Sequence, residues 1–452
     1  MGLIISHSVG RNLHRHPNSH RHCAGITNPG LSVLRPLTQI LGLRGLSLLT
    51  TRPLLIAYWV SVANIMGVSL LYPVLPAIAE QLSISEAESA LTIVAFTTPA
   101  IVMAPFFGLV ADLRGRRRLL IVALFGFGAT GASVAFAPTF EWVLALRVLQ
   151  GVTNSALSPL SIVLIGDLLE GDHETRSQGL KVIIDRVVTM FLPFAGGLLA
   201  LLSWRAPFLA FAIVLPFAFL AAHWMPETLP TRNTQSKTYI GGVWKAIRHP
   251  RLLAAFLAGF LRFFLDYGFF TYFPLLLASS HGVSTAEGGL LFAFFGVGAI
   301  ASASQVGPLI RRFDRGILLV TAFIVDGICL LVWPFLGNLW MWGAALLAYG
   351  LANGLISPLQ KSLLTRNAPT ELRGGVISVD RVFHQLGKSL APAVLGVVLV
   401  TNGGPAVFWT LGLLSLMSVL LSTAYLGADR FRRRFRPTML EPNGSPRRKG
   451  RS

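Results

Sequence analysis

Apolar segments long enough to cross a lipid bilayer recur along this chain from Pro53 to about Leu426. A helix needs about 20 residues to span the hydrocarbon core. A single segment in lipid can satisfy its own backbone hydrogen bonds only as a helix. Charged residues make up only 13% of the chain, against about 25% in soluble domains. A single soluble core of this composition would leave little to face water. The sequence therefore predicts an all-α membrane protein.

Charged or Pro/Gly-rich breaks divide the apolar region into twelve predicted transmembrane helices, in two sets of six. The first set covers 53–79, 89–111, 118–138, 141–168, 180–202 and 205–224. The second set covers 252–278, 287–310, 317–336, 339–364, 376–400 and 405–426. We therefore expect a basic, disordered N-terminal tail at 1–52, an N-terminal six-helix half at 53–225, a connector at 226–251, a C-terminal six-helix half at 252–426 and a basic C-terminal tail at 427–452.

The positive charge of the chain, +19 in total, is concentrated in alternate loops and in the two tails. Examples are the loops at 114–118 and 311–315. The intervening loops contain no Lys and only one Arg, Arg205. By the positive-inside rule, the basic loops, the connector and both termini are cytoplasmic. This distribution argues against a nucleic-acid partner and predicts a multi-pass protein of the cell (inner) membrane.

The first 52 residues contain five of the ten histidines and no Asp or Glu. A metal-binding tract, a targeting segment or a myristoylation site are the alternatives to a disordered tail. Cys23 and Cys329 match no disulfide framework and no metal spacing. The sequence has no phosphate-cradling GxxxxGK[ST] motif. We therefore expect no enzyme, no metal and no cofactor, with an ion gradient as the energy source.

A repeated segment links the two sets of predicted helices. GVTNSALSPL at Gly151 reappears as GLANGLISPL at Gly350, with Gly, Asn, Ser and Pro at matching places 199 residues apart. The repeat predicts two parallel six-helix halves. Secondary transporters built on this plan bind their substrates near the midplane, between the halves.

The loop GLVADLRGRRR resembles the signature between the second and third helices of the major facilitator superfamily. The matching residues are Gly108, Asp112, Gly115, Arg116 and Arg117, while Leu113 replaces a basic residue. The counterpart at Gly307 in the second half is degenerate. The resemblance covers residues 53 to 426, and it implies the major facilitator fold and transport by alternating access.

Further motifs resemble the twelve-helix drug:proton antiporter branch of this family. Arg147 lies in LRVLQGV, which resembles the fourth-helix motif of proton-coupled members, and the resemblance implies a role in proton translocation. The alternative is a structural arginine that binds neighbouring carbonyl groups. The antiporter motif of the fifth helix, whose glycines allow close helix packing, is matched in part: Val188 and Leu192 replace two glycines, and the retained residues are Gly179, Pro193, Gly196 and Gly197.

Two Asp-Arg pairs lie just inside predicted helices, at 185–186 and 380–381. Both lie under about 10 Å from a helix end, so their side chains reach the membrane surface. In the family the signature loop contacts the cytoplasmic end of helix eleven, which implies pairing of Asp112 and Arg116 with the second pair when the protein faces outward. Interfacial capping is the alternative. The predicted cytoplasmic gate comprises Gly108, Asp112, Gly115, Arg116, Asp185, Arg186, Asp380 and Arg381.

Charged residues deeper in the helices are the candidates for coupling and binding, because each costs about 2.5–3.5 kcal/mol at the bilayer centre. Asp380, His384 and Lys388 follow one another at four-residue intervals and therefore share a helix face. His384 could relay protons, and Lys388 could meet an acidic group of the substrate. An internally neutralised stripe is the alternative.

Arg262 and Asp266 are four residues apart in helix seven, which by resemblance lines the central cavity. A carboxylate such as Asp266 can carry a proton, because protonation removes the cost of moving its charge through the membrane. A neutral local ion pair is the alternative. Tyr267 lies in an aromatic run suited to an amphiphilic ligand. Proton coupling is therefore predicted at Asp266, Arg147 and His384, and the substrate cavity at Lys388, Arg262, Tyr267 and Asn64. Asp326 in helix nine is a weaker candidate for proton coupling, because by resemblance that helix packs at the periphery.

These features together predict a proton-coupled transporter that exports small amphiphilic organic molecules. The alternative is a proton-coupled importer of a small organic anion. A third possibility is a protein that senses or scrambles lipid without coupled transport. The expected partners are the small-molecule substrate and the lipid bilayer, and the expected state is a monomer.

Overall fold

The computed structural model describes residues 51–227, 250–367 and 373–434, and these residues form helices and no strand. Twelve helical segments are long and apolar enough to cross a membrane. The predicted all-α membrane fold with twelve transmembrane helices is therefore confirmed. The predicted N-terminal tail and connector fall almost entirely outside the described residues, so those predictions stay untested, whereas residues 427–434 of the predicted C-terminal tail continue helix α18.

The N-terminal half supplies six of the twelve segments. Its elements are α3 (Arg52–Ser69), η2 (Tyr72–Val74), α4 (Leu75–Gln81), α5 (Glu86–Thr97), α6 (Pro99–Arg114), α7 (Arg116–Ser133), η3 (Val134–Phe136), α8 (Phe140–Leu168), α9 (Gly171–Leu202), α10 (Ala206–Leu209), η4 (Ala210–Ile213) and α11 (Val214–Trp224). The second predicted helix, 89–111, is divided into α5 and α6 at Thr98. Pro99 follows at once, and proline has no N–H group with which to continue the backbone ladder.

The C-terminal half supplies the other six segments. Its elements are α13 (Pro250–His281), α14 (Thr285–Arg312), α15 (Arg315–Val332), η5 (Trp333–Phe335), α16 (Leu339–Asn367), α17 (Arg373–Asn402) and α18 (Gly404–Arg434). Several of these helices are longer than the apolar segments, because hydropathy marks the lipid-facing stretch and misses the polar turns beyond it.

The second helix of each half begins with the same device. Ser85 and Glu88 form a capping box at the start of α5, and Ser284 and Glu287 form one at the start of α14. In each box the serine hydroxyl accepts from the glutamate N–H, and the glutamate side chain accepts from the serine N–H. This arrangement satisfies two N-terminal donors that a helix leaves unpaired. The boxes are 199 residues apart, the same offset as the repeated segment.

The repeated segment itself makes equivalent contacts in the two halves. Gly151 on α8 packs against the Phe96 carbonyl, and Gly350 on α16 packs against the Phe295 carbonyl, again 199 residues later. In both places a Cβ atom would overlap the facing backbone oxygen, so only glycine allows the helices to approach this closely. The two halves are therefore structural repeats, as the sequence predicted.

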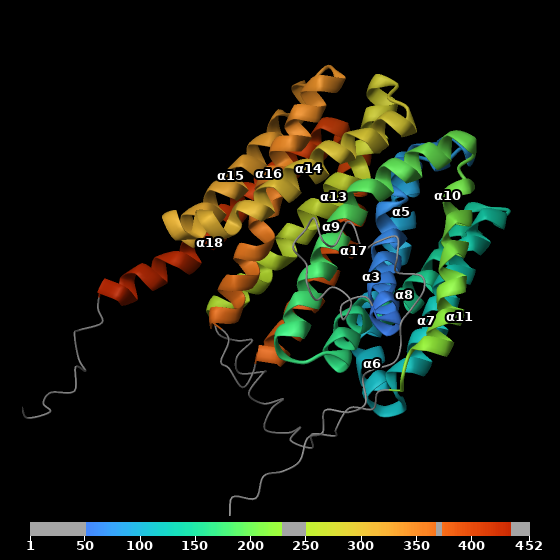
Figure 1. The fold of residues 1–452 in the computed structure, drawn as a ribbon. Helices are drawn as coiled ribbons and strands as arrows, with labels where there is room; N and C mark the ends of the chain where they lie inside the picture. Colours follow the sequence, from blue (N-terminus) through green and yellow to red (C-terminus); the bar gives the residue numbers. More distant parts are fainter. Residues whose placement is uncertain (1–50, 228–249, 368–372, 435–452) are drawn as a thin grey trace, which may run out of the picture. The chain divides into compact units, whose positions relative to one another are not determined.

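The halves meet along two pairs of helices, α9 with α14 and α5 with α17. Figure 1 shows the first half in blue to green beside the second half in yellow to red. We call the end at which α3 begins and α11 ends the basic side, and the other end the opposite side. At the opposite side, η2 and α4 contact α13, and the Tyr72 ring stacks on Phe292 of α14 at 6.0 Å. These contacts close the opposite side.

Candidate functional site

Asp266 lies near the middle of α13 and is buried, with 7% of its surface exposed. Two groups of α16 donate hydrogen bonds to its Oδ1 atom: Asn353 Nδ2 at 2.5 Å and the Tyr349 hydroxyl at 3.3 Å. The Arg262 guanidinium, one turn away on α13, lies 3.7 Å from Oδ2. The sequence-predicted pair Arg262 and Asp266 is therefore formed, and two neutral donors from a second helix complete it.

The predicted stripe on α17 lies against the same part of α13. His384 Nε2 lies 3.1 Å from Asp380 Oδ2, and the His384 ring lies 4.4 Å from the ring of Phe263. Lys388 Nζ lies 4.9 Å from the centre of the Phe263 ring and 5.3 Å from that of Tyr267. The structure thus brings both predicted groups of charged residues together. We call this site the α13–α17 cluster. Its members are Arg262, Phe263, Asp266 and Tyr267 of α13, Asp380, His384 and Lys388 of α17, and the α16 residues Tyr349 and Asn353 that bind Asp266.

Lys388 differs from the other charged residues of the α13–α17 cluster, because it forms no ion pair with any described residue. Its cation–π contacts with Phe263 and Tyr267 are worth about 0.5–2 kcal/mol each, depending on desolvation. A lysine at the bilayer centre costs about 2.5–3.5 kcal/mol on insertion scales. At the lower end of that range the two rings offset less than half of the cost, and water or an anion at Lys388 would offset the rest.

Three residues of the cluster were missed by the sequence analysis: Phe263, Tyr349 and Asn353. Phe263 has Arg262, His384 and Lys388 around its ring, but one phenylalanine in an aromatic run has no distinguishing local signal. Asn353 lies in the repeated segment and was used only as a marker of the repeat. An amide in the middle of an apolar helix was the signal that could have found it.

Arg147 is fully buried in α8. It donates to the carbonyl groups of Gly67 (2.9 Å) and Thr92 (3.2 Å) and to the Gln150 side chain (2.7 Å). Its guanidinium also lies 4.2 Å from the centre of the Phe96 ring. This geometry is the one expected of an arginine that binds neighbouring carbonyls, and it joins α3, α5 and α8. A role in proton coupling stays a prediction.

Three of the predicted gate residues, Arg116, Asp185 and Asp380, pair within their own halves in this structure. Arg116 forms an ion pair with Asp167 of α8. Lys181 Nζ lies 2.7 Å from Asp185 Oδ2 on α9, while Arg381 is exposed. The side chain of Asp112 lies outside the described residues. The pairing predicted between the signature loop and α17 belongs to an outward-facing state, so this structure does not test it.

Two glycines of the signature loop have different surroundings. Gly115 has φ +93°, which L residues with a side chain rarely adopt, and its Cβ position is filled by the Glu227 carboxylate. Among the described residues, no atom outside its own helix backbone lies within 4 Å of the Cβ position of Gly108. Gly115 is therefore required by the turn between α6 and α7, whereas nothing in this state requires Gly108.

The residues of the antiporter-type motif lie along α9. A Cβ at Gly196 would overlap the Leu70 carbonyl within the first half, and one at Gly197 would overlap the Thr285 carbonyl of the second half. The buried Pro193 presents its backbone 2.8 Å from the Cβ position of Gly289 on α14. Gly179 has open space around it. Gly197 and Pro193 therefore help to build the contact between the halves at the opposite side, whereas Gly196 packs α9 within the first half.

The remaining predicted cavity residues lie apart from each other. Tyr267 is half-buried, and its ring meets that of Tyr72 edge to face at 6.3 Å. Asn64 is half-buried on α3 and forms no hydrogen bond with a described residue. The lower-ranked Asp326 is fully buried between α15 and α18, where its Oδ2 lies 3.0 Å from Ser415 Oγ. Tyr267 thus joins the α13–α17 cluster to the closed side, and Asn64 stays a prediction.

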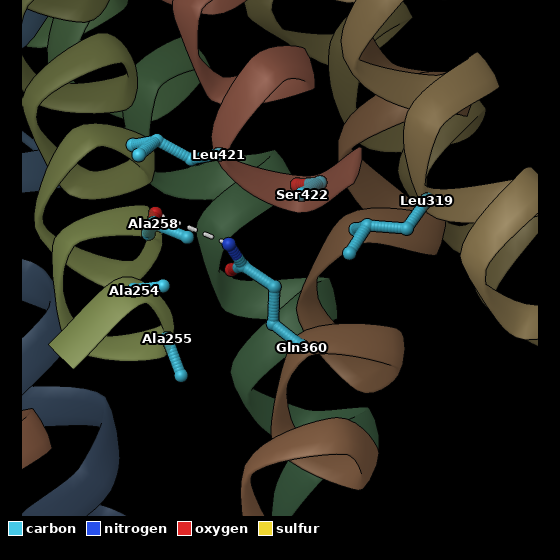
Figure 2. Close-up of a pocket in the computed structure, with 7 residues that line it drawn as sticks. All are labelled: Ala254, Ala255, Ala258, Leu319, Gln360, Leu421 and Ser422. Atoms are coloured by element: carbon cyan, nitrogen blue, oxygen red, sulfur yellow. Dashed lines mark hydrogen bonds between the residues drawn. The ribbon is translucent and has the colours of Figure 1, made fainter. Parts of the chain in front are cut away.

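A small cavity lies among α13, α15, α16 and α18, shown in Figure 2. Its lining includes Ala254, Ala258 and Ser422, and Gln360 Nε2 donates to the Ala258 carbonyl at 3.1 Å. The cavity volume is about 30 Å³, and one water needs about 10–15 Å³ by this measure. It can hold water and is too small for an organic substrate.

Known proteins resemble this chain in sequence and in fold. The bacillibactin exporter of Bacillus subtilis is 27% identical over 79% of this chain and 92% of its own length. A chloramphenicol resistance protein of Streptomyces lividans is 28% identical over 79% of this chain and 92% of its own length. Among solved structures, a bacterial homologue of the human lysosomal transporter Spinster, in an inward-facing and unoccupied conformation, has a TM-score of 0.65 at 16% identity, covering 84% of this chain and 97% of that one.

The sequence profile of the Major Facilitator Superfamily matches residues 57–392 and, in a second match, residues 276–448. These matches include nearly all the described helices of both halves. The resemblance seen in the signature loop and in the repeated segment is therefore confirmed over most of the chain. The chain is a member of the Major Facilitator Superfamily and resembles its drug-efflux transporters.

Proposed function

We propose that this protein is a proton-coupled exporter of small amphiphilic organic molecules, which works as a monomer by alternating access in the cell membrane. The basic side is the cytoplasmic side in this proposal, by the positive-inside rule. With its opposite side closed, the structure then corresponds to an inward-facing state. The observation that carries the proposal is the buried Asp266 carboxylate near the centre of α13, whose ion pair with Arg262 is long at 3.7 Å.

Asp266 suits a proton site because its environment serves both of its charge states. Asn353 and Tyr349 donate to the ionised carboxylate, and Arg262 lies near it at 3.7 Å. That distance is longer than the 2.7–2.9 Å of a tight charge-assisted hydrogen bond, so loss of the negative charge breaks no close contact. A proton on Asp266 would leave Arg262 available for another anion.

The charged groups facing Asp266 come from several elements. Arg262 lies on α13 itself. Arg186 lies on α9, in the other half, within electrostatic range of Arg262 and Asp266. Proton binding at Asp266 therefore changes the electrostatic attraction between α9 and α13. That attraction crosses the boundary between the halves, and so it links protonation to alternating access.

The direction of transport is inferred from relatives. The names of similar proteins include a bacillibactin exporter, a chloramphenicol resistance protein and multidrug efflux proteins, and each spans most of this chain. An organic-anion importer is the second candidate, because Lys388 presents a cation without a carboxylate partner among the described residues. A protein that moves lipid is the third, and it should move labelled lipid without a proton gradient.

The proposal is tested in proteoliposomes with an imposed pH gradient and a pH-sensitive dye inside. The compounds added are the cation ethidium, the neutral chloramphenicol and the anion fluorescein. Proton flux opposite to compound flux indicates antiport, and flux in the same direction indicates import with protons. Asp266→Asn should abolish gradient-driven transport while leaving binding of the same compound.

The matched control is Asp326→Asn, which changes another buried carboxylate of the same half. We expect it to keep gradient-driven transport. Undiminished coupling in Asp266→Asn would show that this carboxylate does not carry the proton. Lipid movement by the wild-type protein in the absence of a gradient, with no compound transported, would favour the third candidate.

A further inference from the structure

Six basic side chains gather where the two halves face each other, and we call them the central basic cluster. They are Lys181 and Arg186 of α9, Arg262 of α13, Lys361 of α16, and Arg381 and Lys388 of α17. Lys361 lies within electrostatic range of four of them, and Lys388 lies within range of Arg262 and Arg381. The cluster therefore acts as one electrostatic region across both halves.

The carboxylates in this region are fewer than the cations, and each already has a partner. Asp185 pairs with Lys181 at 2.7 Å, Asp266 with Arg262 at 3.7 Å, and Asp380 with His384 at 3.1 Å. Three carboxylates thus face six basic side chains. Even without Lys361, the three carboxylates are outnumbered by five basic side chains among the described residues, so this part of the structure has an excess of positive charge.

Solvent reaches this region from the basic side. Lys361 and Arg381 are exposed, and Arg186 and Lys388 are partly exposed, although helices of both halves lie close to them. The opposite side is closed by the contacts of α9 with α14 and of Tyr72 with Phe292. A molecule that enters from the basic side therefore meets the cations first, and the aromatic contacts lie beyond them.

Lys388 is the innermost of these cations and the one that most needs a partner. It lies on the faces of Phe263 and Tyr267, and among the described residues it forms no ion pair. A carboxylate, sulfonate or phosphate that displaced water from Lys388 would form a charge-assisted hydrogen bond, the stronger kind. A flat apolar body attached to that group would lie against the two rings.

We propose that the molecule carried by this protein is an organic anion with an aromatic or apolar body, whose acidic group binds Lys388 while its body packs against Phe263 and Tyr267. This inference deepens the proposed function and rests on it for the transport step. An organic cation is disfavoured at this site, because it would lie among six basic side chains whose charges repel it.

The test measures equilibrium binding to the purified full chain in nanodiscs, with no pH gradient. The probes are fluorescein, an anion, and rhodamine 123, a cation built on the same ring system, and fluorescence anisotropy reports binding. We expect fluorescein to bind at least tenfold more tightly than rhodamine 123, and its binding to weaken as ionic strength rises.

The variants separate charge from packing. Lys388→Gln should weaken fluorescein binding about tenfold or more, whereas Lys388→Arg should retain most of it. Arg205→Gln is the matched control, since it removes an exposed arginine on the opposite side, outside the central basic cluster. The melting temperature of each variant shows that it is folded. Tighter binding of rhodamine 123, absence of fluorescein binding, or unchanged binding in folded Lys388→Gln would each overturn the proposal.

An anionic lipid headgroup has the same chemistry as the proposed ligand, and the nanodisc composition distinguishes the two. Phosphatidylglycerol that competes with fluorescein, when phosphatidylcholine does not, would assign Lys388 to lipid and overturn the proposal. The outcomes also separate this inference from the proposed function. Lys388-dependent fluorescein binding without gradient-driven flux contradicts only the proposed function, whereas gradient-driven export of rhodamine 123 alone contradicts only this inference.

Discussion

Gly197 provides a direct test of how the opposite side closes. It lies on α9 and packs against the start of α14 in the other half, where an added Cβ would overlap the Thr285 carbonyl oxygen. The same Cβ would lie 3.1 Å from the Thr285 carbonyl carbon and 3.2 Å from Ala286 Cα. All three are backbone atoms of the first turn of α14, so no side chain can rotate away. Gly197→Ala therefore forces α9 and α14 apart.

The size of the effect follows from the cost of overpacking, which is about 1–3 kcal/mol for an extra carbon in a close-packed contact. That cost applies only while the opposite side is closed, because the contact crosses the two halves. At about 1.4 kcal/mol per tenfold change, the equilibrium should shift toward the state open on the opposite side by about 5- to 150-fold.

The measurement is the distance between spin labels at two exposed positions on the opposite side, Gln81→Cys on α4 and Ser280→Cys on α13. The background carries Cys23→Ser and Cys329→Ser, which removes both native cysteines. Pulsed electron spin resonance should show a population at longer distances in Gly197→Ala.

Gly179→Ala is the control for this experiment, since it makes the same chemical change on the same helix at a position where no described residue places an atom within 4 Å, apart from the backbone of the helix itself. We expect its distance distribution to match that of the parent. Equal distributions in Gly197→Ala and Gly179→Ala would refute the argument that this contact closes the opposite side.

Three further predictions concern single residues outside the α13–α17 cluster. Gly115→Ala should lower the free energy of unfolding by about 1–3 kcal/mol, because φ is +93° and ψ is +147° there, a region that residues other than glycine rarely adopt; an unchanged melting temperature would contradict the strain argument. Arg147→Lys should destabilise the first half, because one ammonium cannot reproduce the bonds of the guanidinium to Gly67 and two further groups; undiminished stability in a thermal shift assay would be inconsistent with a structural role. Asp326→Asn should keep the stability of the parent protein. The Ser415 hydroxyl has a single proton and donates it to the Phe323 carbonyl at 2.9 Å, so a neutral Asp326 carboxyl would donate to Ser415 Oγ. A loss of stability above about 3 kcal/mol would indicate an ionised Asp326.

Local sequence was enough to predict the helices and their repetition. The apolar segment 317–336 corresponds to α15 and η5, and 405–426 lies within α18. Hydropathy and glycine spacing are properties of neighbouring residues, so they are readable without a fold. The division of the second helix at Pro99 also has a local cause, but hydropathy does not register it.

The composition of the candidate site was only partly predictable. The pairs Arg262–Asp266 and Asp380–His384 are one helical turn apart, so their spacing alone placed them together. Asn353 reaches Asp266 from 87 residues away. No local pattern selects that partner from the other polar residues of the apolar helices.

The sequence by itself determined twelve membrane-spanning helices, two related halves and the positions of the charges along each helix. Only the tertiary structure decided which charges meet, because helix rotation and the packing of α13 against α16 and α17 set those contacts. It gave Asp266 its amide and hydroxyl donors, and it placed Lys388 on two aromatic rings without an ion pair among the described residues. The physical reason is that hydropathy constrains how deep a residue lies in the membrane, whereas its partners depend on the direction in which its helix face points.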